Sequence, residues 1–188
     1  MKRQLFLIGP ILILGFLFAL TNSDSIKLFP TLSAQEKEKQ TKEKKDDSKL
    51  IWYKYDEGMA KAKTDKKHVL INFYTDWCGF CKKMDNETFK NEKVRKLLNS
   101  SFVPVKVNAN SSREVVMEGK KITEKELALR YYVRAYPVNW FLKSSGEKIG
   151  QVPGYIPAQE FANFLAFVKD DLFEKMTYDQ YLKTKKKE

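Results

Sequence analysis

The chain has 188 residues, of which 43% are hydrophobic, 13% aromatic and 31% charged, with only 8 Gly. This composition supports one globular domain with a real core and argues against a fibrous or fully disordered chain. The net charge is +11, but many lysines fall in mixed-sign or terminal runs at 37–49 and 183–187, which are typical of solvated spacers. We therefore expect no nucleic-acid partner.

The N-terminus carries an uncharged apolar run over residues 5–20, preceded by Lys2 and Arg3. This pattern predicts a signal peptide or membrane anchor over 1–21, and a buried core helix is a weaker alternative. As a helix the run would reach about 24 Å, short of the roughly 30 Å hydrocarbon core, yet it is slightly long for a cleaved signal. We favour cleavage and expect a periplasmic or otherwise extracytoplasmic protein, secreted or tethered through residues 5–20.

The rest of the chain divides by composition. Residues 22–49 are dominated from Gln35 onward by Lys, Glu, Gln, Thr and Asp, which predicts a charged linker. The folded domain is expected over 50–175, followed by a basic tail over 176–188. Apolar residues at three- and four-residue steps predict that a helix opens the domain, with one face formed by Trp52, Tyr55, Met59 and Ala62.

A strand, a helix and a second strand are expected next. The apolar run over 68–75 is rich in β-branched and aromatic residues, which predicts a strand buried on both faces. From Lys82 onward, roughly helical spacing predicts one helix through Met84, Phe89, Val94, Leu97 and Leu98. Residues 102–107 predict the second strand. Because the three elements form a βαβ unit, the two strands should be parallel.

The second half begins with a helix. Thr123 and Glu126 have the spacing of a capping box before the apolar residues of that helix. After Pro137, residues 138–142 and 148–152 predict an antiparallel pair joined by a turn that contains Gly146. Pro157 suits the first turn of a last helix, with an inner face of Phe161, Phe164, Leu165 and Val168. The expected order is α-β-α-β-α-β-β-α, an α/β protein.

The chain contains only two cysteines, Cys78 and Cys81, spaced C-x-x-C between a buried strand and a helix. This spacing and position are typical of a redox pair. A zinc site would need two more ligands, and the sole histidine, His68, lies ten residues upstream, so we expect no metal. A purely structural disulfide is the other alternative, although so small a loop adds little stability.

Their positions on the helix predict the role of each cysteine. A thiolate at the first turn faces unpaired backbone N–H groups and the positive end of the helix dipole. Cys78 is therefore the predicted nucleophile, which attacks a substrate disulfide. Cys81, one turn further along, would then attack the Cys78 sulfur and release the reduced substrate.

The residues around this pair resemble a known family. The string 77–82 (W-C-G-F-C-K) resembles the thioredoxin motif W-C-G-P-C-K, and Tyr136-Pro137 resembles the cis-proline loop of that family. The stretches 73–78 (F-Y-T-D-W-C) and 82–89 (K-K-M-D-N-E-T-F) are similar to the C-terminal periplasmic domain of DsbD-type thiol:disulfide interchange reductases and to related secreted proteins. The resemblance covers about residues 50–170 and implies a thioredoxin fold, a central mixed β-sheet flanked by helices.

The resemblance also implies roles for further residues. Trp77 would flank the partner, Pro137 would be the cis residue facing the sulfurs, and the backbone of Tyr136 would pair with an extended substrate segment. Proline suits a position beside a thiolate because it has no N–H to bind the sulfur. An ordinary turn proline is the alternative.

Three positions depart from the family pattern. Asn72 replaces a buried acid that assists proton transfer, so we expect another route through Asp85 and Lys106, which match a second acidic group and a semi-buried lysine. An exposed helix acid and a strand-edge lysine are the alternatives for these two residues. Phe80 replaces the dipeptide proline and Tyr136 replaces threonine, and both changes concern redox potential or partner choice.

These observations predict a protein-disulfide reductase that needs no organic cofactor and is recharged by a membrane thiol donor. Neither Gly79 nor Phe80 supplies a cation to stabilise the Cys78 thiolate, so we expect a potential nearer about −270 mV than about −120 mV. A disulfide oxidase or isomerase is an alternative with the same chemistry. A non-catalytic thioredoxin-like binding or chaperone module is an alternative of another class.

Overall fold

The computed structural model of the protein describes residues 49–186. The predicted signal or anchor over 1–21 and nearly all of the predicted linker over 22–49 lie outside these residues. Within residues 49–186, no helix combines the length and apolar character needed to cross a membrane.

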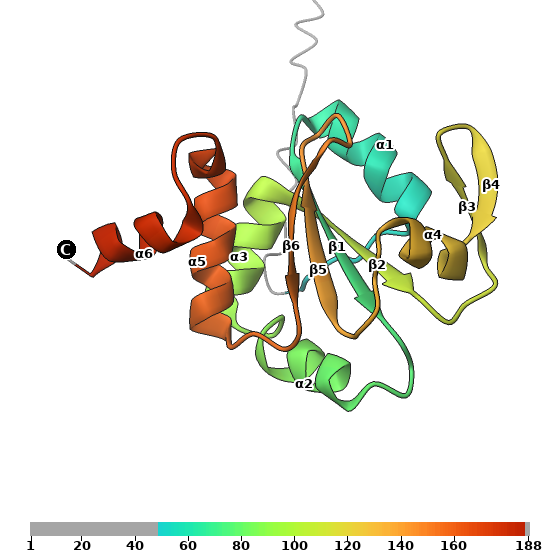
Figure 1. Ribbon diagram of the computed structural model, residues 1–188, viewed down its shortest axis with the longest axis horizontal. Helices are drawn as coiled ribbons and strands as arrows, with labels where there is room; N and C mark the ends of the chain where they lie inside the picture. Colours follow the sequence, from blue (N-terminus) through green and yellow to red (C-terminus); the bar gives the residue numbers. More distant parts are fainter. Residues whose placement is uncertain (1–48, 187–188) are drawn as a thin grey trace, which may run out of the picture. The chain divides into compact units, whose positions relative to one another are not determined.

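A four-stranded mixed sheet forms the centre of the domain (Figure 1), in the order β2-β1-β5-β6. Strand β1 (His68–Tyr74) is parallel to β2 (Phe102–Asn108), whereas β5 (Val138–Leu142) is antiparallel to both β1 and β6 (Lys148–Pro153). The five central residues of β1 are buried. The predicted parallel βαβ unit and the antiparallel pair are therefore both confirmed.

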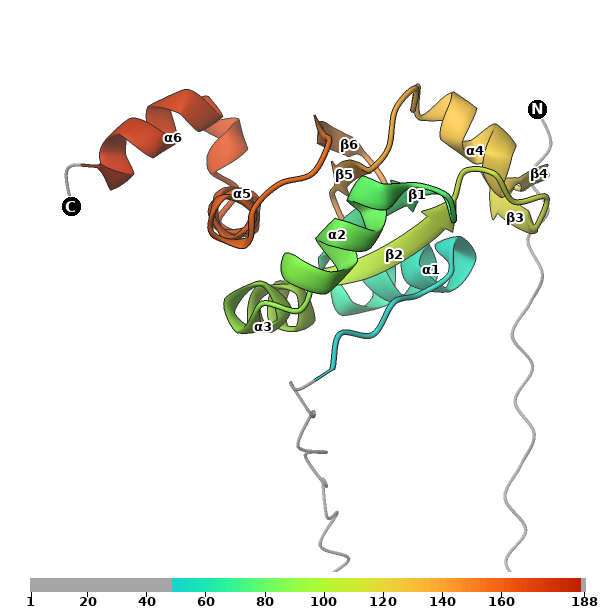
Figure 2. The ribbon, with the colours of Figure 1, turned by 90° about the horizontal axis from the view of Figure 1, so that it is seen from below.

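Helices cover both faces of this sheet, as Figures 1 and 2 show. Because successive strand residues point to opposite faces, Val69 and Ile71 join a core with α1 (Tyr55–Asp65) and α4 (Glu124–Arg130). Leu70 joins a second core on the opposite face. That core is formed with α2 (Gly79–Glu87), α3 (Glu92–Ser101) and α5 (Ala158–Lys169).

The single helix expected from Lys82 onward is wrong, because the chain forms α2 and α3 instead. The Oδ1 atom of Asn91 accepts hydrogen bonds from the backbone N–H groups of Lys93 (3.0 Å) and Val94 (3.3 Å), and so caps α3. Just before it, the buried Thr88 hydroxyl donates to the carbonyl of Ile156 at 2.5 Å. Local capping and this tertiary bond end one helix and start another.

The opening helix also begins later than expected, at Tyr55. Trp52 lies before it, and its ring packs edge-on against Phe89 with a centroid distance of 4.8 Å. The expected capping box of Thr123 and Glu126 is present at the start of α4. Pro157 lies at the N-cap of α5, one position before its first turn.

Four elements were not expected. Strands β3 (Glu114–Met117) and β4 (Lys120–Thr123) form a separate hairpin between β2 and α4. After α5 the chain forms a short 3-10 helix, η1 (Leu172–Glu174), and then α6 (Tyr178–Lys185), which lies within the segment expected as a basic tail. The ring of Tyr178 stacks on Phe164 of α5, with ring centroids 3.7 Å apart.

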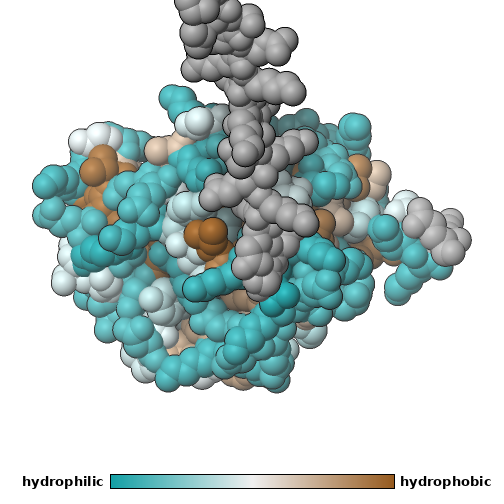
Figure 3. Space-filling view, turned by 180° about the vertical axis from the view of Figure 1, so that it is seen from behind, coloured by the Kyte–Doolittle hydropathy of each residue, from teal (hydrophilic) through white to brown (hydrophobic). Residues whose placement is uncertain are grey.

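Seen from behind, the described surface is mostly hydrophilic, with small separate apolar patches (Figure 3).

Candidate active site

The two cysteines lie where the chain leaves β1 and enters α2. Cys78 is the N-cap of α2, Cys81 lies in its first turn, and a disulfide joins them across a Cα–Cα distance of 5.3 Å. Both are buried, with exposed fractions of 6% and 3%. The structure thus brings together the two residues on which the predicted chemistry depends.

Backbone groups at the start of α2 surround the first sulfur. The N–H of Cys81 donates to the Sγ atom of Cys78 at 3.1 Å, and no acidic residue lies in the first turn of the helix. The same N–H group and the positive end of the helix dipole would stabilise a thiolate at Cys78 after reduction. The local electrostatics therefore favour the ionised form of this sulfur.

Two large apolar side chains beside the disulfide face solvent. Trp77 is 69% exposed and Phe80 is 64% exposed. The sequence predicted a partner surface at Trp77 and identified Phe80 as a departure from the family motif that concerns redox potential or partner choice. The sequence carried a signal for the exposure of Phe80. Adjacent residues of a helix point in different directions, so Phe80 cannot face the core together with Cys81.

The predicted cis-proline loop lies next to this surface. The Tyr136–Pro137 peptide bond is cis. The rings of Trp77 and Tyr136 meet edge-on with centroids 5.8 Å apart, and the Pro137 carbonyl accepts a hydrogen bond from the Gly154 N–H at 2.7 Å. Residues from two separate loops therefore meet beside the Cys78–Cys81 disulfide.

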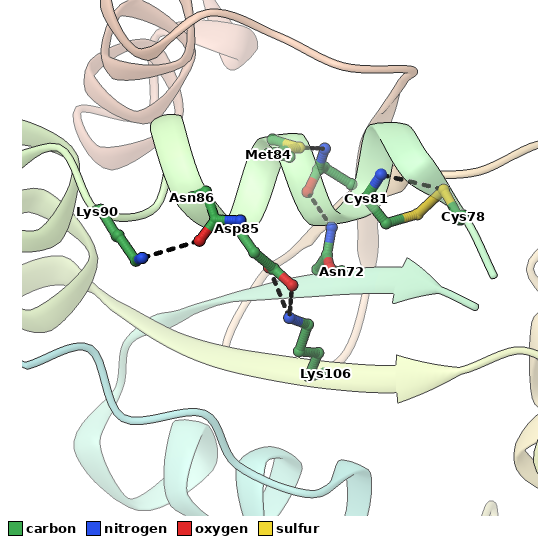
Figure 4. Close-up of polar contacts among 9 residues, drawn as sticks. Asn72, Cys78, Cys81, Met84, Asp85, Asn86, Lys90 and Lys106 are labelled. Carbon is green, nitrogen blue, oxygen red and sulfur yellow. Dashed lines mark hydrogen bonds and ion pairs between the residues drawn. A yellow bond between two sulfur atoms is a disulfide. The ribbon is translucent and has the colours of Figure 1, made fainter. Parts of the chain in front are cut away.

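A neutral polar pair lies beneath α2, where the family commonly has an acid. Asn72 is 2% exposed, and its Nδ2 donates to Oδ1 of the buried Asn139 at 2.9 Å. The Asn139 amide in turn donates to the Sδ atom of Met84 at 3.6 Å. Figure 4 shows Asn72 pointing from β1 towards α2, beneath the turn that carries Cys81.

The structure also brings together Asp85 and Lys106. Asp85 lies four residues after Cys81 on α2, and both of its carboxylate oxygens are 2.6 Å from the Lys106 Nζ (Figure 4). Lys106 lies on the edge strand β2, opposite Asn72 in the strand register. Both side chains are partly buried, so the acid and the lysine form a pair below the cysteines instead of extending separately into solvent.

The surrounding groups do not form a metal centre. Among residues 49–186, no three His, Cys, Asp or Glu side chains gather as metal ligands. His68 lies at the opposite end of β1 from the cysteines, with its Nε2 atom 3.0 Å from Asp171.

Tyr74 lies near the Asp85–Lys106 ion pair. Burial is the main cause that raises the pKa of Tyr74, and the charge of Asp76 adds to it.

The fold and this constellation match a known family. The profile of the thioredoxin-like domain matches residues 55–169. The chain belongs to the thioredoxin-like family. It has the mixed α/β thioredoxin fold and the C-x-x-C pair of the disulfide oxidoreductases in that family, which suggests thiol–disulfide exchange.

Individual relatives agree with this assignment. The chain is 33% identical over 107 residues to a protein disulfide-isomerase from Ricinus communis, and 29% identical over 107 residues to the thiol:disulfide interchange protein DsbD from Yersinia pestis. These matches cover 54% and 55% of this chain but only 19% and 16% of the relatives. The chain thus corresponds to less than a fifth of either relative's length.

Solved structures agree in fold. A thioredoxin from Thermus thermophilus is 31% identical, with a TM-score of 0.53, and the match covers 63% of this chain and 86% of that one. A thioredoxin-fold protein from Helicobacter pylori is 26% identical, with a TM-score of 0.55, and the match covers 64% and 80%.

Proposed function

We propose that this thioredoxin-like protein is an extracytoplasmic protein-disulfide reductase. The observation that carries the proposal is the Cys78–Cys81 disulfide at the start of α2, where a backbone N–H lies 3.1 Å from the Cys78 sulfur. That position supports a stable thiolate at Cys78. The apolar run over residues 5–20 supports the extracytoplasmic location.

In the reductive half-reaction both cysteines begin reduced. The Cys78 thiolate attacks one sulfur of the substrate disulfide, and the other substrate sulfur leaves as a thiolate. Cys81 then loses its proton and attacks the Cys78 sulfur, which expels the remaining substrate sulfur. Two electrons pass to the substrate, and the protein ends with the Cys78–Cys81 disulfide. A membrane dithiol donor would restore the reduced pair by the same exchange.

The proton of Cys81 needs an acceptor, because the amide of Asn72 cannot take it up. Asp85 lies one helical turn beyond Cys81, and its charge is balanced by Lys106. We assign this ion pair the role of assisting proton transfer or tuning the thiol pKa. Because both groups are partly buried, their fields at the sulfurs are screened less than those of surface charges.

The partner would bind over the disulfide. Trp77 and Phe80 expose apolar surface there, and the backbone of Tyr136 at Pro137, next to Trp77, can pair with an extended segment. Extended, cysteine-containing segments of disulfide-bonded proteins are therefore the proposed substrates. No organic cofactor is needed, because the two thiols carry both electrons.

Insulin reduction tests the proposal. The reduced protein should reduce insulin with dithiothreitol as the electron source, and Cys78→Ser should abolish this activity. Cys81→Ser should instead hold its substrates as mixed disulfides through Cys78, which mass spectrometry would identify. The double variant Cys78→Ser/Cys81→Ser is the control that traps nothing. Full function in Cys78→Ser would favour a binding module.

A disulfide isomerase or oxidase remains the second candidate, because one relative is a protein disulfide-isomerase. Refolding of a scrambled, disulfide-rich substrate separates the two functions. A reductase should accelerate the loss of disulfides without increasing the yield of native pairing. A marked increase in native pairing would favour the isomerase.

A further inference from the structure

A basic hollow of about 360 Å³ adjoins α2, and neither Trp77 nor Phe80 lines it. The segment before α1 contributes Lys49, the end of the α2 region contributes Lys90, α3 contributes Arg95 and β2 contributes Lys106. Asp85 is the only acidic residue among the described residues that line it. Within residues 49–186, four cations therefore line the hollow against one carboxylate.

The single acid does not balance this charge. Both oxygens of Asp85 are taken by Lys106 at 2.6 Å. The Nζ atom of Lys90 donates to the neutral amide of Asn86 at 2.8 Å. The Nε atom of Arg95 is buried and has no hydrogen-bond partner among residues 49–186. Because Asp85 is already paired, no other carboxylate among the described lining residues balances Lys49, Lys90 and Arg95, and an anion in the hollow would supply the missing negative charge.

The remaining wall of the hollow is apolar. Leu50, Trp52 and Phe89 line it, and the rings of Trp52 and Phe89 meet edge-on at 4.8 Å. The Nζ atom of Lys106 lies 5.2 Å from the centre of the Trp52 ring. Cations beside an aromatic wall suit a ligand that has a charged head and an apolar body.

We propose that this hollow binds a small organic anion, a carboxylate or a phosphate ester with an apolar or aromatic body. The anionic head would lie among Lys90, Arg95 and Lys49, and the body would pack on Trp52. The site is distinct from the surface assigned to protein substrates, so it does not depend on the proposed function. It nevertheless adjoins the active site, because Lys106 also pairs with Asp85 on the helix that carries Cys81.

Calorimetric titration of the full chain with phenyl phosphate and with benzoate tests the proposal. The two probes also show whether the hollow prefers a phosphate head or a carboxylate head. At least one probe should bind one to one with a Kd below about 1 mM. Inorganic phosphate should bind more weakly than phenyl phosphate, and neutral benzyl alcohol should not bind. The Trp52 indole N–H signal in an NMR spectrum should move on binding, while the Trp77 and Trp140 signals stay in place.

Charge-removing variants locate the site. Arg95→Gln should weaken binding about tenfold or more, the usual effect of losing a charge-assisted hydrogen bond. Lys90→Gln, at an exposed position that does not endanger folding, should weaken it less. Lys93→Gln is the matched control, because it removes the same charge from α3 but lies outside the hollow. No saturable binding of either probe, or equal losses in Arg95→Gln and Lys93→Gln, would overturn the proposal.

Discussion

Replacing Asn72 by aspartate would place an acid where the thioredoxin family commonly has one. In this chain the position is 2% exposed, and its side chain faces Asn139, which is fully buried. The introduced carboxyl would lose its hydration and would initially meet the Oδ1 acceptor of Asn139. Lys106 lies opposite on β2, but its ammonium is already paired with Asp85. We therefore expect desolvation to dominate and to raise the carboxyl pKa.

The magnitude follows from this burial. Full burial commonly raises the pKa of a carboxyl by about 3 units or more, and each unit corresponds to about 1.4 kcal/mol. With a raised pKa the native state binds more protons than the unfolded state, so stability falls as the pH rises above about 4. We expect Asn72→Asp to lose about 4 kcal/mol of unfolding free energy, relative to the natural chain, between pH 4 and pH 8.

Urea unfolding of the oxidised protein at several pH values measures this difference. Asn110→Asp is the control, because it adds the same charge at an exposed loop position and should show less than about 0.5 kcal/mol of extra pH dependence. If Asn72→Asp shows a change below about 1 kcal/mol, Lys106 compensates the buried charge. The reasoning that desolvation dominates this site would then be refuted.

Three further variants test the packing by urea unfolding. Arg113→Ala should cost about 2 kcal/mol, because it leaves the buried Glu124 unpaired; the value is below that of a fully buried pair since Arg113 is about a third exposed. Gly58→Ala should cost about 1–3 kcal/mol, because the added Cβ would lie 2.2 Å from Cγ2 of Val105. Thr123→Ala should cost about 1 kcal/mol by removing the α4 capping box.

Each variant has an outcome that contradicts its argument. Unchanged stability in Arg113→Ala would mean that Glu124 finds another partner. Gly79→Ala, where nothing lies within 4 Å of the added Cβ, should be tolerated, and an equal loss there would remove the steric explanation for Gly58. A stable Thr123→Ala would show that tertiary packing alone holds the start of α4.

Strand β1 and the active-site loop were predictable because their signals are local. The continuous apolar run of β1 and the C-x-x-C pair that follows it define the strand, the turn and the helix start within about a dozen residues. The identity of the cis-proline loop came from the family resemblance. Neither prediction required knowledge of which distant residues come into contact.

The features that were missed depend on less obvious or more distant signals. Asn91 is a favourable N-cap residue that could have shown the break between α2 and α3, whereas the Thr88–Ile156 bond that accompanies it is tertiary. Glu118 and Gly119 both have positive φ and form the two-residue turn between β3 and β4, so the glycine at this position is the hairpin signal that the sequence carries.

The basic hollow could not be predicted from the sequence at all. Its cations come from the segment before α1, the α2 region, α3 and β2, and only the folded sheet and helices bring them together. The pairing of Asp85 with Lys106 was expected only as two separate family positions, and their 2.6 Å contact also arises from the tertiary fold. Charge counts along the chain carry no information about such convergence.

The equilibrium of the protein with reduced and oxidised glutathione tests most directly whether the Cys78–Cys81 pair is a reducing dithiol. A C-x-x-C pair without a cation in its dipeptide should have a reduction potential close to about −270 mV. The natural chain should therefore remain largely oxidised except in strongly reducing mixtures. A measured value close to about −120 mV would show a strongly oxidising pair and would contradict the account.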